Sequence, residues 1–139
     1  MSLETPTGVI VDDIPENLCL LHESLDQAGY QVLVATNGFD AIEIAHRIQP
    51  DMILLDGSMP EMDGFETCTQ LKASPVTEHI PVIFMTGLTE TEHILKGFQV
   101  GGVDYVTKPL NIDEVRARVK THLLQARLMH QQRQMLDAT

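Results

Sequence analysis

Five short apolar runs, each followed by a longer segment of helical periodicity, restrict the fold of this chain more than any other feature. The runs cover residues 8–11, 31–35, 52–55, 82–85 and 103–107. Strands this short and apolar are typical of a parallel sheet that is covered on both faces. Their alternation with helices predicts the α/β class rather than a helical bundle or a β-sandwich.

The segments between the runs carry apolar residues at helical spacing. The first follows Pro15, with Leu18, Leu21, Leu25 and Ala28 on one face, and ends at Gly29. Further helices are expected at residues 39–48, 65–73 and 90–100, and a last one begins at Asn111. Because crossovers between parallel strands are right-handed, few strand orders remain, and 2-1-3-4-5 is expected. We predict a doubly wound (βα)5 three-layer sandwich of the flavodoxin-like kind.

Ligands in such sheets bind beyond the carboxyl ends of the strands, where the strand order reverses. The polar residues that follow the runs are Asp12 and Asp13 after the first, Asp56 after the third, Thr86 and Gly87 after the fourth, and Lys108 and Pro109 after the fifth. Three carboxylates at one edge repel one another unless a cation compensates them. Lys108 and a bound divalent cation would do so.

The chemistry of these side chains indicates Mg²⁺ and phosphoryl transfer. Mg²⁺ prefers oxygen ligands, retains several waters and is usually bound by one or two carboxylates near a phosphate. No His or Cys follows a strand, which disfavours zinc. An Asp nucleophile can form an aspartyl phosphate. Asp56 is best placed for this role because its strand is central in the predicted sheet.

In order and spacing, these residues resemble the receiver domains of bacterial response regulators over about residues 8–125. The likeness rests on the pair Asp12-Asp13, the segment Asp56-Gly57-Ser58-Met59-Pro60-Glu61-Met62-Asp63-Gly64, the pair Thr86-Gly87, and the segment Tyr105-Val106-Thr107-Lys108-Pro109. The resemblance implies a signalling switch, rather than a classical enzyme, that takes a phosphoryl group from the phosphohistidine of a sensor kinase or a histidine phosphotransfer protein.

The resemblance also implies roles for the residues of the site. Asp56 would be the phosphoacceptor, and Asp13, Asp56 and the backbone carbonyl of Ser58 would bind Mg²⁺. Asp12 would act mostly through water. Lys108 would contact the phosphoryl group, and the bond that precedes Pro109 would be cis.

Two further pairs of residues would govern the switch and its lifetime. Thr86 and Tyr105 resemble the family's switch pair, in which the hydroxyl moves toward the phosphoryl group and the aromatic ring turns into the vacated space. Gly87 would leave room for the phosphate. Ser58 and Leu88 occupy positions associated with the dephosphorylation rate, and neither is suited to position a hydrolytic water, so we expect a phosphoryl group that lasts minutes or longer.

The organisation expected along the chain is a flexible N-terminus at residues 1–7, one receiver domain at 8–125 and an extended helix at 126–139. The last helix has apolar residues that would cover the sheet and others beyond it; these are Ile112, Val115, Val119, Leu123 and Ala126, then Leu128, Met129, Met135 and Leu136. The extension is either a frayed tail or a signalling helix that pairs with its twin or leads into an output domain. The face of the fourth helix, fifth strand and fifth helix is the other candidate for a homodimer.

Charge and hydropathy limit the partners. The formal net charge of -11 disfavours direct binding of nucleic acid or of an anionic membrane. The apolar runs are far shorter than the roughly 20 residues that a bilayer requires, and the N-terminus lacks the basic and apolar regions of a signal peptide. We expect a cytoplasmic location.

Three other functions compete with this interpretation. A flavodoxin-like electron carrier would need a phosphate loop after the first strand, where Asp12 and Asp13 would repel a phosphate. A magnesium-dependent phosphatase would need a second acid near Asp56 and a substrate cap, and no insertion is long enough for one. A degenerate receiver that serves only as an interaction module would lack one of the key residues.

Overall fold

The computed structural model describes residues 5–87 and 91–137, with side chains described as far as Leu128. In chain order the elements are β1 (Thr7–Val11), α1 (Pro15–Gln27), β2 (Gln31–Ala35), α2 (Gly38–Ile48), β3 (Met52–Asp56), α3 (Gly64–Lys72), β4 (Val82–Gly87), α4 (Thr91–Gln99), β5 (Asp104–Lys108) and α5 (Ile112–Asp137). The strands form one parallel sheet in the order β2-β1-β3-β4-β5. The predicted fold class and strand order are therefore confirmed.

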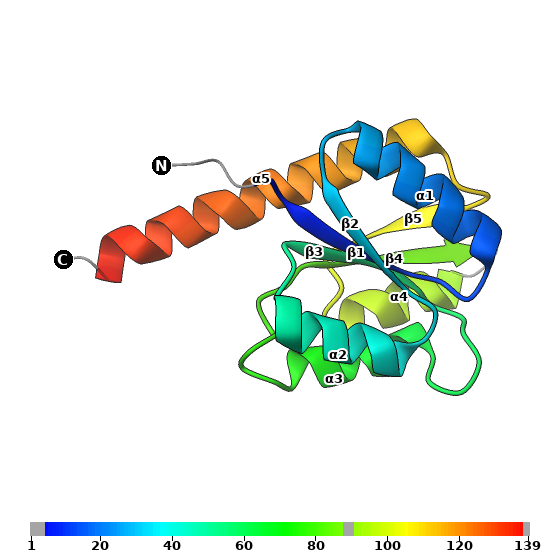
Figure 1. Ribbon diagram of the computed structural model, residues 1–139. Helices are drawn as coiled ribbons and strands as arrows, with labels where there is room; N and C mark the ends of the chain where they lie inside the picture. The colour runs from blue at the N-terminus through cyan, green and yellow to red at the C-terminus, as the bar shows by residue number, and fades with distance from the viewer. Residues whose placement is uncertain (1–4, 88–90, 138–139) are drawn as a thin grey trace.

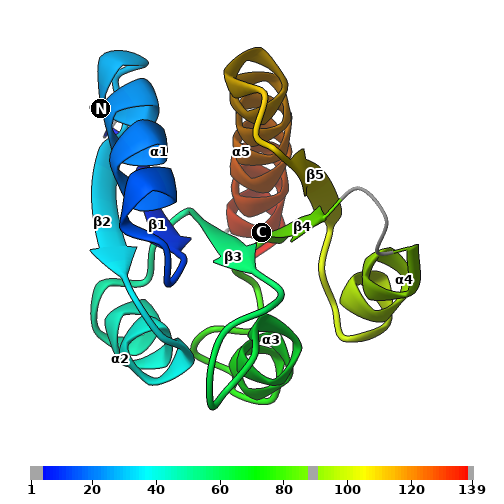
Figure 2. The ribbon, with the colours of Figure 1, turned by 90° about the vertical axis from the view of Figure 1, so that its right-hand side faces the viewer.

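The sheet separates two apolar layers. Helices α1 and α5 cover one face, and α2, α3 and α4 cover the other (Figure 2). On the first face Leu21, Leu25 and Val119 pack against strand residues such as Ile10 and Leu54. The second layer likewise joins buried residues of α2 and α3 to the strands. Burial on both faces explains why β3 is apolar from Met52 to Leu55, with no alternation.

Most element boundaries lie within one residue of those expected from the sequence, but β4 ends at Gly87, two residues later than expected, so Thr86 and Gly87 are its last residues. Strand β1 begins at Thr7, inside the segment expected to be flexible, and the Thr7 amide donates to the Asp51 carboxylate at 2.7 Å. Strand β5 begins and ends one residue later than predicted. The predicted N-cap of the last helix is confirmed, because the Asn111 side chain accepts from the amide of Glu114 at 3.1 Å. Residue 90, the expected start of α4, lies outside the described residues.

Helix α5 runs well past the body of the domain (Figure 1). Val115, Val119 and Leu123 are buried against the sheet, as predicted. Ile112 and Ala126, the other two residues expected to cover the sheet, are half-buried, whereas Leu124 and Leu128 are 58% and 51% exposed. Among the described helices, none is both long and apolar enough to cross a membrane.

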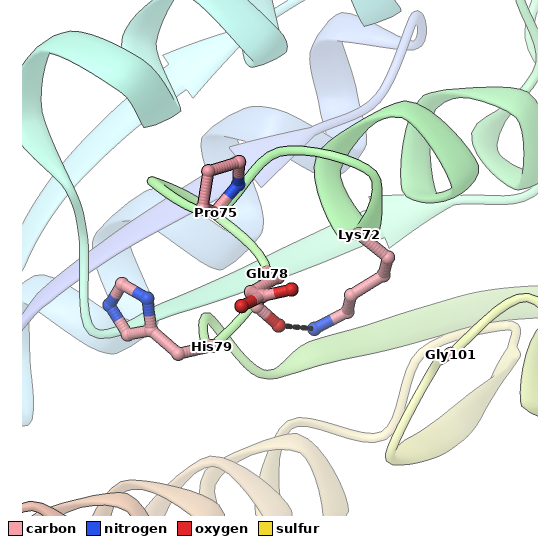
Figure 3. Close-up of a pocket in the computed structure, with 5 residues that line it drawn as sticks. All are labelled: Lys72, Pro75, Glu78, His79 and Gly101. Atoms are coloured by element: carbon pink, nitrogen blue, oxygen red, sulfur yellow. Dashed lines mark hydrogen bonds between the residues drawn. The ribbon is translucent and has the colours of Figure 1, made fainter.

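The Lys72 side chain links the end of α3 to the backbone that leads into β4. The Lys72 ammonium, at the end of α3, donates to the carbonyls of Glu78 and Ile80 at 2.9 and 2.6 Å. Burial lowers the pKa of Lys72. These hydrogen bonds lie in a pocket that is also lined by His79 and Gly101 (Figure 3). The ammonium donates to backbone carbonyls of its own chain, so the role of Lys72 here is structural.

Candidate functional site

The carboxyl ends of β1 and β3 bring three acidic side chains together. Asp12 and Asp56 are 0% and 3% exposed, whereas the neighbouring Asp13 is exposed. One oxygen from each of the three carboxylates lies within 4.8 Å of the other two. The convergence expected from strands β1 and β3, which are neighbours in the sheet, is therefore present.

Lys108, the last residue of β5, completes this cluster from another strand. Its Nζ atom lies 3.3 Å from Asp12 Oδ2 and 3.1 Å from Asp56 Oδ2. The Lys108–Pro109 peptide bond is cis, as the sequence resemblance implied. One ammonium group thus bridges two buried carboxylates.

The charge of Asp56 is poorly compensated in this arrangement. Burial raises the pKa of Asp56 to about 6, although the Ser58 amide, 3.1 Å from Asp56 Oδ1, and the Lys108 ammonium both oppose that rise. The Asp12 carboxylate adds to it. For Lys108, burial would lower the pKa, but the two carboxylates outweigh burial and raise it. The site therefore favours an additional cation.

Asp12 is held by more donors than the other two acids. Its Oδ1 atom accepts from the Ile14 amide at 2.9 Å, and its Oδ2 atom accepts from Asn17 Nδ2 at 3.1 Å, besides facing Lys108. Asn17 was not among the residues predicted from the sequence. Its position in the first helical turn after the acidic pair was the available signal, but polar residues are common there in any helix.

Thr86 and Gly87 end strand β4 beside this cluster. Thr86 is 3% exposed, and its Oγ1 atom has no hydrogen-bond partner within the described part of the chain. A buried hydroxyl without a partner costs about 1–3 kcal/mol. Gly87 pairs with Lys108 in the sheet. Leu88, for which an effect on the dephosphorylation rate was expected, lies outside the described residues.

Tyr105 lies on the same face of the sheet as Thr86, because it pairs with Phe84, two residues earlier on β4. Its half-buried ring meets the Phe98 ring edge to face, with 6.1 Å between centroids. The Arg118 guanidinium lies 5.8 Å from the centre of the Tyr105 ring. The predicted switch residue therefore packs between α4 and α5.

An ionic cluster next to Tyr105 was also not predicted. Asp104 accepts from Arg118 with both carboxylate oxygens, at 2.9 and 2.8 Å, and from His122 Nε2 at 2.9 Å. Burial would raise the pKa of Asp104, but the bonds from His122, from the Tyr105 amide and from Arg118 together lower it. The cluster links β5 to α5, and its two α5 residues, Arg118 and His122, lie one helical turn apart.

The donor set fits Mg²⁺. The three carboxylates and the one ammonium of this cluster leave a net charge of -2, which one divalent cation would neutralise. All the available ligand atoms are oxygens, and Asp13 is open to solvent, so bound waters can be retained. Asp12, Asp13 and Asp56 could therefore hold the ion.

The doubly wound sheet carries its acidic cluster and its lysine at the carboxyl ends of the strands, where the resemblance to receiver domains implied a phosphorylation site. A sequence model described as "Response regulator receiver domain" matches residues 9–120. The chain belongs to this family. Receiver domains of two-component systems act as switches regulated by phosphoaspartate and interact with histidine kinases or phosphotransfer proteins.

Three similar proteins illustrate the match. A Vibrio cholerae protein named "Probable cyclic di-GMP phosphodiesterase" is 46% identical over 117 residues, 84% of this chain and 26% of that protein. Sporulation initiation phosphotransferase F of Bacillus subtilis is 38% identical over 115 residues, 83% of this chain and 91% of that protein. The receiver domain of a Pseudomonas aeruginosa sensor histidine kinase, solved with a magnesium ion in its active site cleft, has a TM-score of 0.80 and 25% identity, covering 86% of this chain and 98% of that one.

The coverage of these relatives differs widely. The chain spans only 26%, 49% and 25% of the length of three of its curated relatives, which are the Vibrio cholerae protein, the regulator RpaA of Synechocystis and the response regulator PleD of Caulobacter vibrioides. In those proteins the receiver is one part of a longer chain.

Proposed function

We propose that Asp56 is the phosphoacceptor of this receiver and that Asp12, Asp13 and Asp56, with the backbone carbonyl of Ser58, form its Mg²⁺ site. The observation that carries the proposal is the position of Lys108, whose ammonium lies within 3.3 Å of both buried carboxylates. The magnesium ion in the similar Pseudomonas receiver supports the metal assignment. Bound Mg²⁺ would neutralise charge on the phosphoryl oxygens.

The reaction transfers a phosphoryl group from a phosphohistidine of a sensor kinase or histidine phosphotransfer protein. A carboxylate oxygen of Asp56 forms the new O–P bond, the P–N bond of the donor breaks, and the imidazole leaves with that electron pair. Lys108 is placed to contact the phosphoryl oxygens beside Asp56. Hydrolysis is slow, because the short Ser58 side chain offers little to position a water. The donor and the receiver meet in the cytoplasm.

The switch operates through Thr86 and Tyr105. The buried Thr86 hydroxyl has no partner among the described residues, so a phosphoryl oxygen on Asp56 supplies the acceptor that it needs. Its movement opens space on the face that it shares with Tyr105. The Tyr105 ring then leaves its contacts with Phe98 and Arg118, which alters the surface formed by α4, β5 and α5.

Incubation with acetyl phosphate and Mg²⁺, followed by intact mass measurement, tests the phosphoacceptor. The unaltered chain should gain one phosphoryl group, and Asp56→Ala should gain none. Asp63→Asn is the matched control, because Asp63 is a nearby N-cap whose role Asn can also fill. No added phosphoryl group on the unaltered chain, or equal labelling of Asp56→Ala, would leave only the interaction-module function.

The part of α5 beyond residue 125 either connects the receiver to an output domain or pairs with the same helix of a second copy of the chain. Leu124 and Leu128 are exposed and lie four residues apart, on one face of the helix. Exposed leucines at this spacing suit a helical pair. The face formed by α4, β5 and α5 is the second candidate surface for a homodimer.

Sedimentation equilibrium of the full chain and of a version ending at Leu123 tests this pairing. The full chain should show self-association, and both the shortened version and the double variant Leu124→Lys with Leu128→Lys should be monomers. Gln125→Lys adds one lysine at an exposed neighbouring position, where the double variant adds two, and should still associate. Equal monomer masses for all four proteins would reject pairing through α5.

A further inference from the structure

Asn17 links helix α1 to the most deeply buried acid of the site. Its Nδ2 atom donates to Asp12 Oδ2 at 3.1 Å, and Asp12 is 0% exposed. With the Ile14 amide on Oδ1 and Lys108 beside Oδ2, donors from the β1–α1 loop, from α1 and from β5 all converge on one carboxylate.

This bond is not what the start of a helix requires. Helix α1 has Ile14 as its N-cap, with no side-chain cap, and Asn17 is the third residue of the helix. In a capping box, a Glu or Gln side chain at that position accepts a hydrogen bond from the N-cap amide. Here the Ile14 amide is taken by Asp12, and Asn17 acts as a donor toward the site instead.

The donors also determine what Asp12 can do. A carboxylate offers about four acceptor positions, and the Ile14 amide, Asn17 and Lys108 occupy three of those on Asp12. Because most of its acceptor positions are occupied, this carboxylate contacts a cation through a bound water more readily than directly. Without Asn17, the Oδ2 atom would keep Lys108 alone, and Lys108 is shared with Asp56. The carboxylate could then rotate, because the terminal torsion of Asp is broad.

We propose that Asn17 is a positioning residue of the magnesium site, which fixes the rotation of the Asp12 carboxylate so that Oδ2 faces Lys108. This inference rests on the proposed function, because it assumes that the cluster binds Mg²⁺. Asn17 acts through Asp12 and contacts neither the metal nor the phosphoryl group.

Titration calorimetry with Mg²⁺ alone tests the role of Asn17. Asn17→Leu, which removes the donor at similar size, should weaken Mg²⁺ binding roughly tenfold, the lower end of the effect of groups that orient metal ligands. Asn17→Ser, whose side chain is too short to reach Asp12, should show the same loss. Glu16→Gln, at the exposed neighbouring position, should bind Mg²⁺ as the unaltered chain does.

A double-mutant cycle separates positioning from a general effect on α1. In an Asp12→Ala background, Asn17→Leu should change Mg²⁺ affinity less than about twofold, because the group through which it acts is gone. A loss that persists undiminished in that background, or Asn17 variants with unchanged affinity, would overturn the positioning role alone. No measurable binding of Mg²⁺ by the unaltered chain would overturn the metal site and the positioning role together.

Discussion

Replacing Asp56 by Asn should raise the free energy of unfolding at neutral pH by about 1–3 kcal/mol, while abolishing phosphorylation. Burial raises the pKa of Asp56 from its ordinary 3.8 to about 6, so at neutral pH the folded protein carries a carboxylate that its surroundings disfavour. Asn keeps the carbonyl oxygen that accepts from the Ser58 amide but carries no charge. Lys108 keeps its contact with Asp12. The variant therefore removes an unfavourable buried charge and loses few stabilising contacts.

The sign of the effect follows from proton binding. Between about pH 4 and pH 6 the folded state holds the Asp56 proton more tightly than the unfolded chain does, so this carboxyl group makes the protein less stable as the pH rises through that window. The full cost is present above about pH 6, and it is absent below the unfolded pKa. The gain from Asp56→Asn should accordingly disappear near pH 4.

Urea unfolding followed by far-UV circular dichroism, at neutral pH and near pH 4, measures this gain in a protein without tryptophan. Asp26→Asn, at an exposed position on α1, is the control and should change stability by less than about 0.5 kcal/mol at either pH. A destabilised Asp56→Asn at neutral pH, or an equal gain at both pH values, would contradict the claim that the ionised carboxylate is disfavoured.

The fold and the outline of the site follow from local sequence. Apolar runs such as residues 52–55 are buried on both faces because helices lie on both sides of the sheet, and their length and composition indicate this directly. Parallel strands end at one edge, so residues that follow them must meet there. This is why Asp56 and Lys108, which are 52 positions apart in the sequence, could be expected to lie close together.

Side-chain direction and partner choice could not be predicted in this way. Asp12 and Asp13 are identical residues in sequence, but one is fully buried and the other exposed. The hydrogen bond from Asn17 depends on the angle at which α1 leaves the sheet. The link from Asp104 to His122 joins two elements whose distance is set by packing of the whole domain. Tertiary geometry decides these contacts, and residue types alone do not encode it.

Replacing Gly64 by Ala should destabilise the protein by about 2–4 kcal/mol and slow phosphorylation of Asp56. Gly64 is the first residue of α3, and its amide donates to the Gly57 carbonyl at 3.2 Å. A Cβ atom here would lie 2.9 Å from the carbonyl carbon of Asp56 and 2.9 Å from the Cα atom of Gly57, and closer still to the Asp56 oxygen. All of these are backbone atoms that no rotamer change can move.

The added methyl group therefore separates α3 from the end of β3, and the segment that carries the phosphoacceptor must move with one of them. Gly8→Ala is the matched control, because its Cβ would meet only the Cγ atom of Met52, at 3.8 Å, an ordinary contact. Urea unfolding should show less than about 1 kcal/mol for the control, and labelling by acetyl phosphate should be slowed only in Gly64→Ala. Equal free energies of unfolding for the two variants would show that the close packing of α3 against β3 does not require Gly64.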